Sequence, residues 1–293
     1  MDGVLNIFKP KGMTSFDVVR DVRKICKTKK VGHTGTLDPE ATGVLPICIG
    51  KATKIIDYIM DSEKTYDVTF KLGIKTDTYD LEGSILDECS TSHLKEEDIL
   101  NVIQSFIGEY SQIPPMYSAL KQNGIRLYEL ARKGIEVERE GRLIKIYNIE
   151  NIIIENPIIK MRVKCSKGTY IRSLCYDIGE ALNVFATMTD LCRTKTSTFD
   201  IENSINIKDL NDENLKNSFI SIENALNHFE SFTVVNDKYS KLLINGVKVC
   251  DPRFTNYDII SDKLYRVYSS NNILIGLGKK TGNGFKIEKL LLT

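Results

Sequence analysis

One carboxylate, Asp38, stands among three glycines, a histidine and a proline in the stretch GHTGTLDPEATG, residues 32–43. Glycine permits backbone conformations that other residues resist, and Pro39 fixes its own φ and biases Asp38 toward extended geometry. We therefore expect a shaped loop that presents His33 and Asp38. A carboxylate held on such a loop can act as a nucleophile or as a general base.

The same loop is also compatible with a purely structural carboxylate. An isolated Asp in a glycine-rich loop is more often a turn or cap residue than a catalyst. The stretch lacks the Lys-Ser/Thr pair of a phosphate-binding GxxxxGK[ST] loop and the second carboxylate spacing of a calcium-binding EF-hand. The residues by themselves thus leave a catalytic and a structural Asp38 open.

The cysteines and histidines do not form a recognisable metal or disulfide pattern. Seven cysteines are scattered along the chain, none of them in a CxxC pair, and only three histidines could assist them. An odd, dispersed set of this kind supports neither a disulfide framework nor a structural zinc site. We expect reduced thiols and no bound metal.

Composition and charge define the class of protein. A chain of 293 residues is long enough for one large domain and a small one. No window approaches the roughly 18 uninterrupted apolar residues of a membrane-spanning helix, and the N-terminus lacks the order of a secretory signal. The sequence therefore predicts a cytoplasmic protein without a membrane segment.

The charges are nearly balanced overall but unevenly distributed. The formal net charge is +1, yet residues 1–60 carry ten Lys/Arg against six Asp/Glu, whereas residues 61–110 carry four against twelve. The overall balance argues against a protein that coats nucleic acid indiscriminately. A local basic face could still bind a polyanion, although solvated surface charges explain the same counts.

The first half of the chain alternates between predicted strands and helices. Residues 4–8 and 44–50 are short apolar strands, and residues 65–73 alternate as a half-buried strand. A helix capped by Ser15 has Val18, Val19, Val22 and Ile25 at helical spacing. Further helices are predicted from near Lys51 and over residues 97–108, the second ending at Gly108.

Residues 109–142 differ from this alternation, because a proline pair, several tyrosines and several basic residues surround one short predicted helix. Such an excursion from a rigid scaffold often carries binding residues. Strands then resume at 143–154 and 159–166, and residues 166–182 turn from a strand end into a helix. Polar connectors over 200–230 suggest a boundary, followed by a β-rich module.

Five blocks of the sequence form a longer pattern: GVLNIFKPKGMTSFDVV (3–19), GHTGTLDPEATGVLPICIGKATK (32–54), KTYDVTFKLGIKTDTYDLEG (64–83), IPPMYSALKQNGIRLYELARKGIEV (113–137) and CSKGTYIRSLCYDIGEAL (165–182). In order and spacing they resemble the TruB family, the tRNA pseudouridine synthases that isomerise the uridine at tRNA position 55. The resemblance implies an α+β pseudouridine synthase fold with a mixed, largely antiparallel sheet and a central cleft. It implies a catalytic domain over 1–230 and a small β-rich PUA-like RNA-binding module over 231–293.

The resemblance implies that Asp38 is the catalytic aspartate, paired with Arg172, which would keep its carboxylate ionised. It implies that Tyr66 is also catalytic, stacking on the flipped base and taking part in removal of the C5 proton at the end of the reaction. Pseudouridine formation breaks the N1 to C1′ bond and joins C5 to C1′, so no atoms are gained or lost and no cofactor is implied. The sequence leaves open whether Asp38 attacks the sugar, attacks the base or removes a proton.

Further substrate contacts follow from the same resemblance. His33 would fill the space left by a uridine flipped out of the RNA, and Leu191 would form an apolar wall with Tyr170 close by. Lys9 is also implied as a substrate-binding residue. Singly, each of these residues is more often structural, but together they stand at the family's spacing.

Residues 109–142 resemble the family's thumb, which closes over the RNA T-loop. Tyr117 and Lys121 would then contribute aromatic and cationic contacts. In TDLCRTKTSTF, residues 189–199, Cys192 stands where the family commonly has an arginine and leaves Arg193 alone. This departure affects one basic RNA contact rather than the catalytic residues.

Three functions stay open at this level. A stand-alone tRNA pseudouridine synthase, acting as a monomer on the T-loop arm of tRNA without an obligatory protein partner, fits the thumb-like insertion best. An RNA-guided pseudouridine synthase shares the same core but largely lacks the thumb. A non-catalytic RNA-binding or RNA-folding protein would keep the scaffold, and the intact set of Asp38, Tyr66 and Arg172 argues against it.

Overall fold

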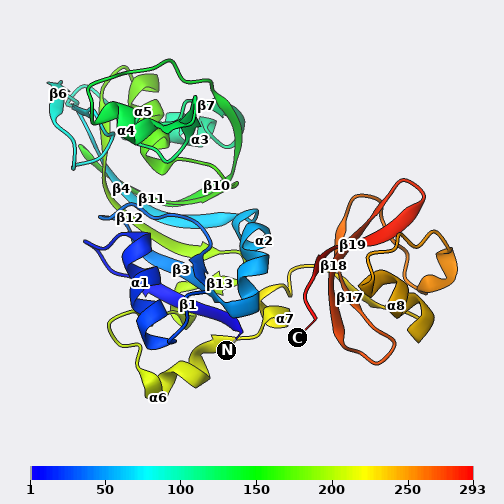
Figure 1. The fold of residues 1–293 in the computed structure, drawn as a ribbon. Coiled ribbons are helices and arrows are strands. Elements are labelled where there is room, and N and C mark those ends of the chain that lie inside the picture. The colour runs from blue at the N-terminus through cyan, green and yellow to red at the C-terminus, as the bar shows by residue number, and fades with distance from the viewer. Residues whose placement is uncertain (1, 293) are drawn as a thin grey trace.

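The computed structural model describes residues 2–292 and contains one large sheet and a smaller separate one (Figure 1). The large sheet has eleven strands, eight of which follow one another in the order β14-β1-β3-β12-β4-β11-β10-β7. Their bounds are β14 (Ile205–Asn206), β1 (Gly3–Lys9), β3 (Thr42–Ile49), β12 (Ala186–Thr196), β4 (Lys64–Leu72), β11 (Ile158–Cys165), β10 (Arg142–Glu155) and β7 (Gly108–Gln112). The remaining three, β2 (Val31–His33), β13 (Phe199–Asp200) and β15 (Phe219–Ile220), pair with β3, β12 and β1.

Most strand pairs of this sheet are antiparallel. Parallel pairing joins β12 to β3 and β1 to β14 only, within the described residues. The predicted mixed, largely antiparallel α+β fold is therefore confirmed. The side chains of β4 alternate between buried and half-buried from Lys64 to Leu72, as expected for a strand with one face on the core.

Helices cover the sheet and close the core. They are α1 (Ser15–Ile25), the 3-10 helix η1 (Gly50–Ile55), α2 (Ile56–Met60), α3 (Glu96–Ser105) and α5 (Ile171–Ala181). Val18, Val19 and Val22 of α1 are buried, which confirms the predicted apolar stripe. The predicted end of α3 at Gly108 is wrong, because Gly108 has a φ of 122° and already begins β7.

Ser15 is not the N-cap of α1. The cap is Thr14, whose side chain accepts a hydrogen bond from the backbone N–H of Asp17, while the Asp17 carboxylate accepts from the Thr14 N–H at 2.9 Å. This reciprocal capping box satisfies two donors at the start of the helix. Ser15 is the first helical residue, and its buried hydroxyl bonds to a distant loop.

Residues 109–142 include an insertion that lies beside the large sheet and is drawn in green in Figure 1, although residues 109–112 still belong to β7 of the sheet. It contains the two-residue strands β8 (Lys121–Gln122) and β9 (Ile125–Arg126) and the short helix α4 (Leu127–Ala131). The hairpin of β5 (Ile74–Thr76) and β6 (Ile85–Glu88) lies on the same side of the molecule. The predicted short helix is confirmed as α4, but the excursion leaves the sheet only after Gln112.

The C-terminal sheet has the order β16-β17-β18-β19. Its strands are β16 (Ser231–Thr233), β17 (Leu264–Tyr268), β18 (Leu274–Thr281) and β19 (Gly284–Leu290), and α8 (Asp237–Ile244), which the sequence patterns do not predict, packs beside them. The short elements η2 (Ile201–Asn203), α6 (Asp212–Leu215), η3 (Lys216–Ser218), α7 (Ile222–Ala225) and η4 (Pro252–Phe254) complete the described chain. The division into domains 1–230 and 231–293 stays a prediction, and its end residues 1 and 293 lie outside the described range.

The two sheets share an apolar cluster. Leu277 and Leu291 from the C-terminal part are buried with Val44 and Cys48 of β3, and the Lys54 ammonium donates to the Leu290 carbonyl at 3.0 Å. None of the helices between residues 2 and 292 has the length and apolar character needed to cross a membrane.

Candidate active site

The loop that carries Asp38 connects β2 to β3 and is fixed on both sides of the carboxylate. Before it, the Ser15 hydroxyl donates to the Leu37 carbonyl at 3.1 Å and accepts from the Leu37 N–H at 2.9 Å. After it, the Pro39 carbonyl accepts from the Gly12 N–H at 2.9 Å. These contacts immobilise both neighbours of Asp38, as a catalytic group requires.

Lys9 lies under this loop rather than on an open surface. Its side chain is fully buried, and its ammonium donates to the carbonyls of Pro10, Met13 and Pro39 at 3.1, 2.7 and 3.0 Å. Burial lowers the pKa of Lys9 to about 8, while the nearby Asp38 carboxylate opposes that shift. The prediction of Lys9 as a substrate contact is corrected, because its ammonium donates to three backbone carbonyls, two in the turn between β1 and α1 and one in the Asp38 loop.

Arg193 of β12 supports the same loop from beneath. Only 1% of its surface is exposed, and its guanidinium donates to the carbonyls of Val44 at 2.8 Å and Gly35 at 3.2 Å. A side chain at Gly43 would collide with the Arg193 backbone, since an added Cβ would come within 2.2 Å of its carbonyl oxygen. The sequence pattern places Arg193 beside an RNA contact, but the structure places it in the interior.

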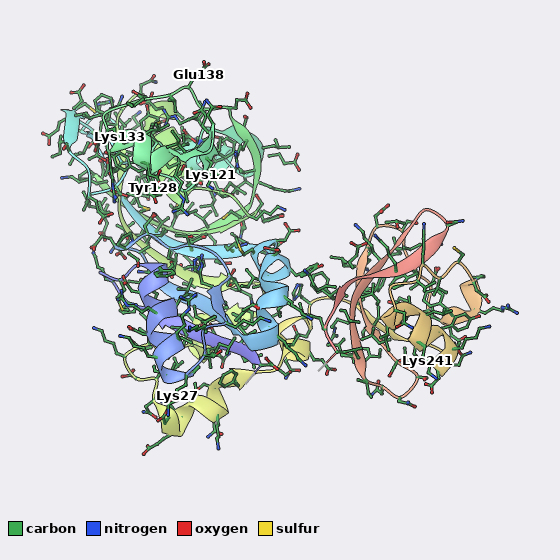
Figure 2. All side chains as sticks on the ribbon, in the orientation of Figure 1. Lys27, Lys121, Tyr128, Lys133, Glu138 and Lys241 are labelled. Carbon is green, nitrogen blue, oxygen red and sulfur yellow. The ribbon has the colours of Figure 1, made fainter. Side chains whose placement is uncertain are left out.

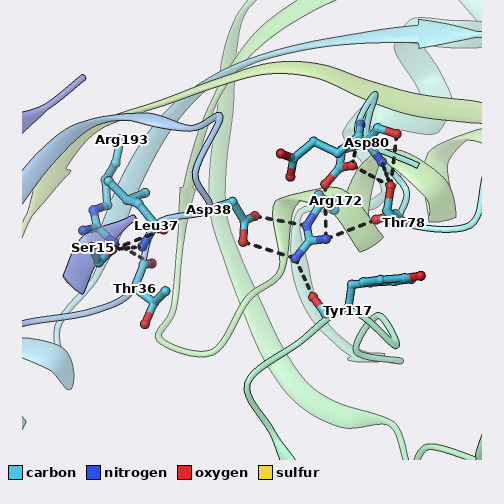
Figure 3. Close-up of polar contacts among 10 residues, drawn as sticks. Ser15, Thr36, Leu37, Asp38, Thr78, Asp80, Tyr117, Arg172 and Arg193 are labelled. Atoms are coloured by element: carbon cyan, nitrogen blue, oxygen red, sulfur yellow. Dashed lines mark hydrogen bonds and ion pairs between the residues drawn. The ribbon is translucent and has the colours of Figure 1, made fainter. Parts of the chain in front are cut away.

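Arg172 of α5 joins Asp38 to a second carboxylate (Figure 3). Its Nε lies 3.1 Å from Asp38 Oδ2 and its Nη2 lies 3.3 Å from Asp38 Oδ1, so the pair is bidentate. The Nη1 atom contacts Asp80 Oδ2 and the Thr78 carbonyl, both at 3.2 Å, and Nη2 also donates to the Tyr117 carbonyl at 2.8 Å. The predicted pairing of Arg172 with Asp38 is thus present in the structure.

Asp80 is a member of the site that the sequence patterns do not single out. Its own carboxylate is fixed by the Thr78 hydroxyl at 2.5 Å and by the Glu82 N–H at 3.0 Å. Within its sequence block it resembles Asp77, Asp67 and other acidic residues. The only sequence feature that could have pointed to Asp80 is its place in a block that resembles the family. The contact to Arg172, which joins distant parts of the sequence, is what distinguishes Asp80 from the neighbouring acidic residues.

The charges around Asp38 act in opposite directions. Burial raises the pKa of the Asp38 carboxyl above its ordinary value, and the Arg172 guanidinium lowers it again. The Asp80 carboxylate adds to the rise, and the Lys9 ammonium opposes it. Because 35% of the Asp38 side chain remains exposed, the carboxylate is accessible while the 7% exposed Arg172 stays behind it.

Tyr66 and Leu191 lie on the neighbouring strands β4 and β12, and His33 ends β2, the strand that leads into the loop. Tyr66 in β4 is the register partner of Arg193 in β12, and it is 8% exposed. Burial raises the pKa of Tyr66, so its phenol form is favoured. His33 ends β2, and its Nδ1 accepts from the Gly35 N–H at 3.3 Å; burial lowers the pKa of this imidazole, and Leu191 is a buried residue of β12.

Of the remaining predicted residues, Tyr170 and Tyr117 lie near Arg172, whereas Lys121 lies away from it on the insertion. Tyr170 directly precedes α5, two residues before Arg172, and burial raises the pKa of its phenol. Tyr117 reaches the site through its carbonyl group. Lys121 is exposed on the insertion in β8, so the structure does not place it in direct contact with the Asp38 group.

This arrangement offers a fixed, partly exposed carboxylate with a guanidinium that favours its ionised form. Such a group can act as a nucleophile or accept a proton. Within residues 2–292, no cluster of three or more His, Cys, Asp or Glu side chains is placed to hold a metal ion. The carboxylate and its guanidinium partner are the reactive groups that these elements bring together.

Comparisons with known proteins agree on one family. Residues 23–171 match the model described as the TruB family pseudouridylate synthase N-terminal domain, and residues 172–229 match the tRNA pseudouridylate synthase B C-terminal domain. Curated relatives named tRNA pseudouridine synthase B include one from Clostridium perfringens, 63% identical over all of this chain and 99% of its own length. Another, from Clostridium tetani, is 56% identical over the full length of both chains.

Solved structures of the same overall shape were also found. One is a chain of the "Crystal Structure of a Cbf5-Nop10-Gar1 Complex", with a TM-score of 0.76 and 29% identity, covering 99% of this chain and 85% of that chain. A chain of the "Structure of H/ACA RNP bound to a substrate RNA containing 2'-deoxyuridine" has a TM-score of 0.74 and 27% identity, with coverages of 99% and 85%. The fold of this chain is therefore shared with these two proteins over almost its whole length.

Proposed function

This chain belongs to the TruB family and is an isomerase that forms pseudouridine in tRNA, and we propose that its target is uridine 55 in the T-loop. The proposed reaction depends on Asp38 and uses no cofactor. The observation that carries the proposal is the bidentate Arg172–Asp38 pair on a loop whose residues on either side are hydrogen-bonded in place. A tRNA T-loop arm is the proposed partner, and the protein acts as a monomer without an obligatory protein partner.

The reaction is a rearrangement within one nucleotide. The N1 to C1′ bond breaks, the base rotates, and C5 joins C1′, after which C5 loses its proton and N1 gains one. The ionised Asp38 carboxylate starts the sequence as nucleophile or base, and Arg172 stabilises the charge that it carries. Atoms and electrons balance within the substrate, so no oxidant or added group is required.

The target base has to leave the RNA stack before Asp38 can reach it. Extrusion costs a few kcal/mol, which contacts inside the site must offset. We propose that His33 fills the vacated space and that the neutral ring of Tyr66 stacks on the flipped base. Leu191 and Tyr170 then line the apolar side of the base, and the burial of Tyr66 and Leu191 and the half-buried position of Tyr170 support these roles.

Selection of the T-loop is assigned to the insertion, residues 109–142. Tyr117 and Lys121 lie on this segment, and the Tyr117 carbonyl contacts Arg172 directly. A guided enzyme that takes its RNA target from partner molecules is the second candidate, because one solved structure of similar shape is by its title an H/ACA RNP bound to a substrate RNA, and another is a Cbf5-Nop10-Gar1 complex. The full-length relatives and the presence of the insertion favour the stand-alone enzyme.

The test uses an unmodified tRNA transcript, no cofactor, and three proteins: the wild type, Asp38→Asn, and Asp258→Asn as a control at an exposed aspartate. Pseudouridine is then mapped at every uridine, and tRNA binding is measured separately. We expect one new pseudouridine, at position 55, with the wild type and the control, and none with Asp38→Asn, whose tRNA binding is retained. Product that appears only after a guide RNA and partner proteins are added would support the guided enzyme instead.

A further inference from the structure

The side-chain amide of Gln112, the last residue of β7, makes two hydrogen bonds to the backbone of Tyr170. Its Nε2 donates to the Tyr170 carbonyl at 3.1 Å, and its Oε1 accepts from the Tyr170 N–H at 2.8 Å. Gln112 is 2% exposed. The amide therefore pairs with Tyr170 as a neighbouring strand would, at the point where the chain enters α5.

The orientation of this amide is fixed from its other side. Gln112 Nε2 also donates to the Tyr110 hydroxyl at 2.8 Å, and that hydroxyl donates to Asp177 Oδ2 on α5 at 3.3 Å. Burial raises the pKa of Tyr110, so the phenol keeps the proton that it donates. The directions of these hydrogen bonds are mutually consistent from Asp177 through Tyr110 and Gln112 to Tyr170. Flipping the Gln112 amide would place its oxygen against the Tyr170 carbonyl and its NH₂ group against the Tyr170 N–H.

The residue held in this way begins the helix that carries Arg172. Tyr170 is the N-cap of α5, and its own side chain makes no capping hydrogen bond. The same segment is tied to the helix twice more, because Ser173 Oγ donates to the Ile113 carbonyl at 2.9 Å and Arg172 Nη2 donates to the Tyr117 carbonyl at 2.8 Å. The first turn of α5 therefore takes its position from the end of β7 and the first residues of the insertion.

We propose that Gln112 is a positioning residue for pseudouridine formation, acting through the Tyr170 backbone to align Arg172 with Asp38. The inference rests on the proposed function of the Arg172–Asp38 pair. Gln112 itself does not contact Asp38 and takes no part in bond making. Because the guanidinium meets Asp38 at 3.1 and 3.3 Å, a small displacement of the first helical turn weakens both contacts at once.

The experiment compares Gln112→Met with Gln104→Met, which makes the same change at an exposed glutamine of α3. Methionine keeps the length of the side chain and removes its hydrogen bonds. Turnover of an unmodified tRNA transcript should fall by about 10- to 100-fold in Gln112→Met, the range for a misplaced catalytic group, while KM changes little. Gln104→Met should match the wild type, and equal turnover of both variants would overturn the inference.

A double-mutant cycle separates positioning from general loosening. Arg172→Lys removes the bidentate geometry that Gln112 is proposed to align, and single-turnover rates are measured for both single variants and for the double variant. If Gln112 acts through Arg172, adding Gln112→Met to Arg172→Lys should cost much less than it costs in the wild type. Fully additive losses would contradict the proposal.

Folding is checked by thermal unfolding, and a second variant decides the matter if Gln112→Met does not fold. Tyr110→Phe keeps the ring and removes only the hydroxyl that orients the amide. It should lower the single-turnover rate by about threefold without changing tRNA binding, since one neutral hydrogen bond contributes about that much. An unchanged rate in Tyr110→Phe would then reject the inference, whereas an inactive wild type would instead reject the proposed function.

Discussion

At the scale of single residues, the site is organised around one guanidinium shared by two carboxylates. Arg172 contacts Asp38 through Nε and Nη2 and Asp80 through Nη1. Both Arg172 and Asp80 are buried, so Asp80 supplies the negative charge that a buried guanidinium needs. Of these three residues, Asp38 is the one that remains open to a substrate; burial raises its pKa, Arg172 lowers it and Asp80 raises it further.

This sharing predicts opposite pH shifts for two variants. Asp38 acts in its ionised form, so the rate rises with pH through its pKa. Arg172 lowers that pKa, and Arg172→Ala should therefore move the acid limb of the pH-rate profile to higher pH, with a rate loss of about 100-fold or more. Asp80 raises the same pKa, and Asp80→Asn should move the limb to lower pH.

Single-turnover rates across the acid range, corrected for tRNA bound at each pH, provide the measurement. If the acid limb shifted in the same direction for both variants, the displacement of Asp38 after either substitution, and not the change in charge beside it, would explain the pH dependence. An unmoved limb in Arg172→Ala would contradict the coupling between the guanidinium and the Asp38 carboxyl.

The site residues differ in how far the sequence predicts them. Asp38 and Arg172 are predicted as a pair because both stand in motifs that resemble one family. The prediction for Lys9 is wrong, and the burial of Arg193 is not predicted, since basic side chains are usually exposed and nothing in their local sequence shows that backbone carbonyls surround them. Burial of this kind depends on β12, the loop and β1 meeting in three dimensions, and no local pattern encodes that meeting.

At the scale of elements, the start of α1 has two neighbouring hydroxyls with different tasks. Thr14 caps the helix, and Ser15 holds Leu37 beside Asp38. The sequence pattern assigns the cap to Ser15, because either residue fits the usual preference for a hydroxyl at that position. Only the contact across 22 residues of sequence shows which hydroxyl belongs to the loop.

Two alanine variants distinguish these tasks. Thr14→Ala should lower the free energy of unfolding by about 1 kcal/mol through loss of the cap, with turnover unchanged. Ser15→Ala leaves the buried Leu37 N–H without its partner, which costs about 1–3 kcal/mol, and it should also lower turnover several-fold because the loop beside Asp38 loosens. Urea denaturation and single-turnover rates measure the two effects, and equal turnover in both variants would argue against any role of Ser15 in holding the loop.

Element types are easier to predict than element ends. The alternation of β4 and the apolar stripe of α1 follow from local periodicity, so the sequence predicts both. The glycine at 108 predicts the end of α3 there, although the helix stops at Ser105 and the glycine serves the turn into β7. The helix α8 is not predicted because its polar segment follows a short strand and resembles the connectors around it.

At the scale of the whole molecule, exposed lysines that could meet RNA lie both on the insertion and on the C-terminal part. Lys121 and Lys133 are exposed on the insertion, and Lys241 is exposed on α8, well away from it in Figure 2. Among residues 2–292, none of these three lysines has a carboxylate oxygen within ion-pair distance. All three are therefore free to meet phosphates, and the position of the bound RNA decides which of them do so.

The proposed function places the T-loop arm over the insertion, which predicts a difference between these lysines. Each phosphate contact releases a condensed counterion, so losing one contact should reduce the slope of log K against log salt by about 0.7–1. Lys121→Gln should show this reduction in tRNA affinity measured across a salt series, because Lys121 lies on the segment that leads to Tyr117 and Arg172. Lys241→Gln is the control and should keep the wild-type slope. A reduced slope in Lys241→Gln with an unchanged one in Lys121→Gln would place the RNA on the C-terminal part instead, and the insertion would lose its proposed role in substrate selection.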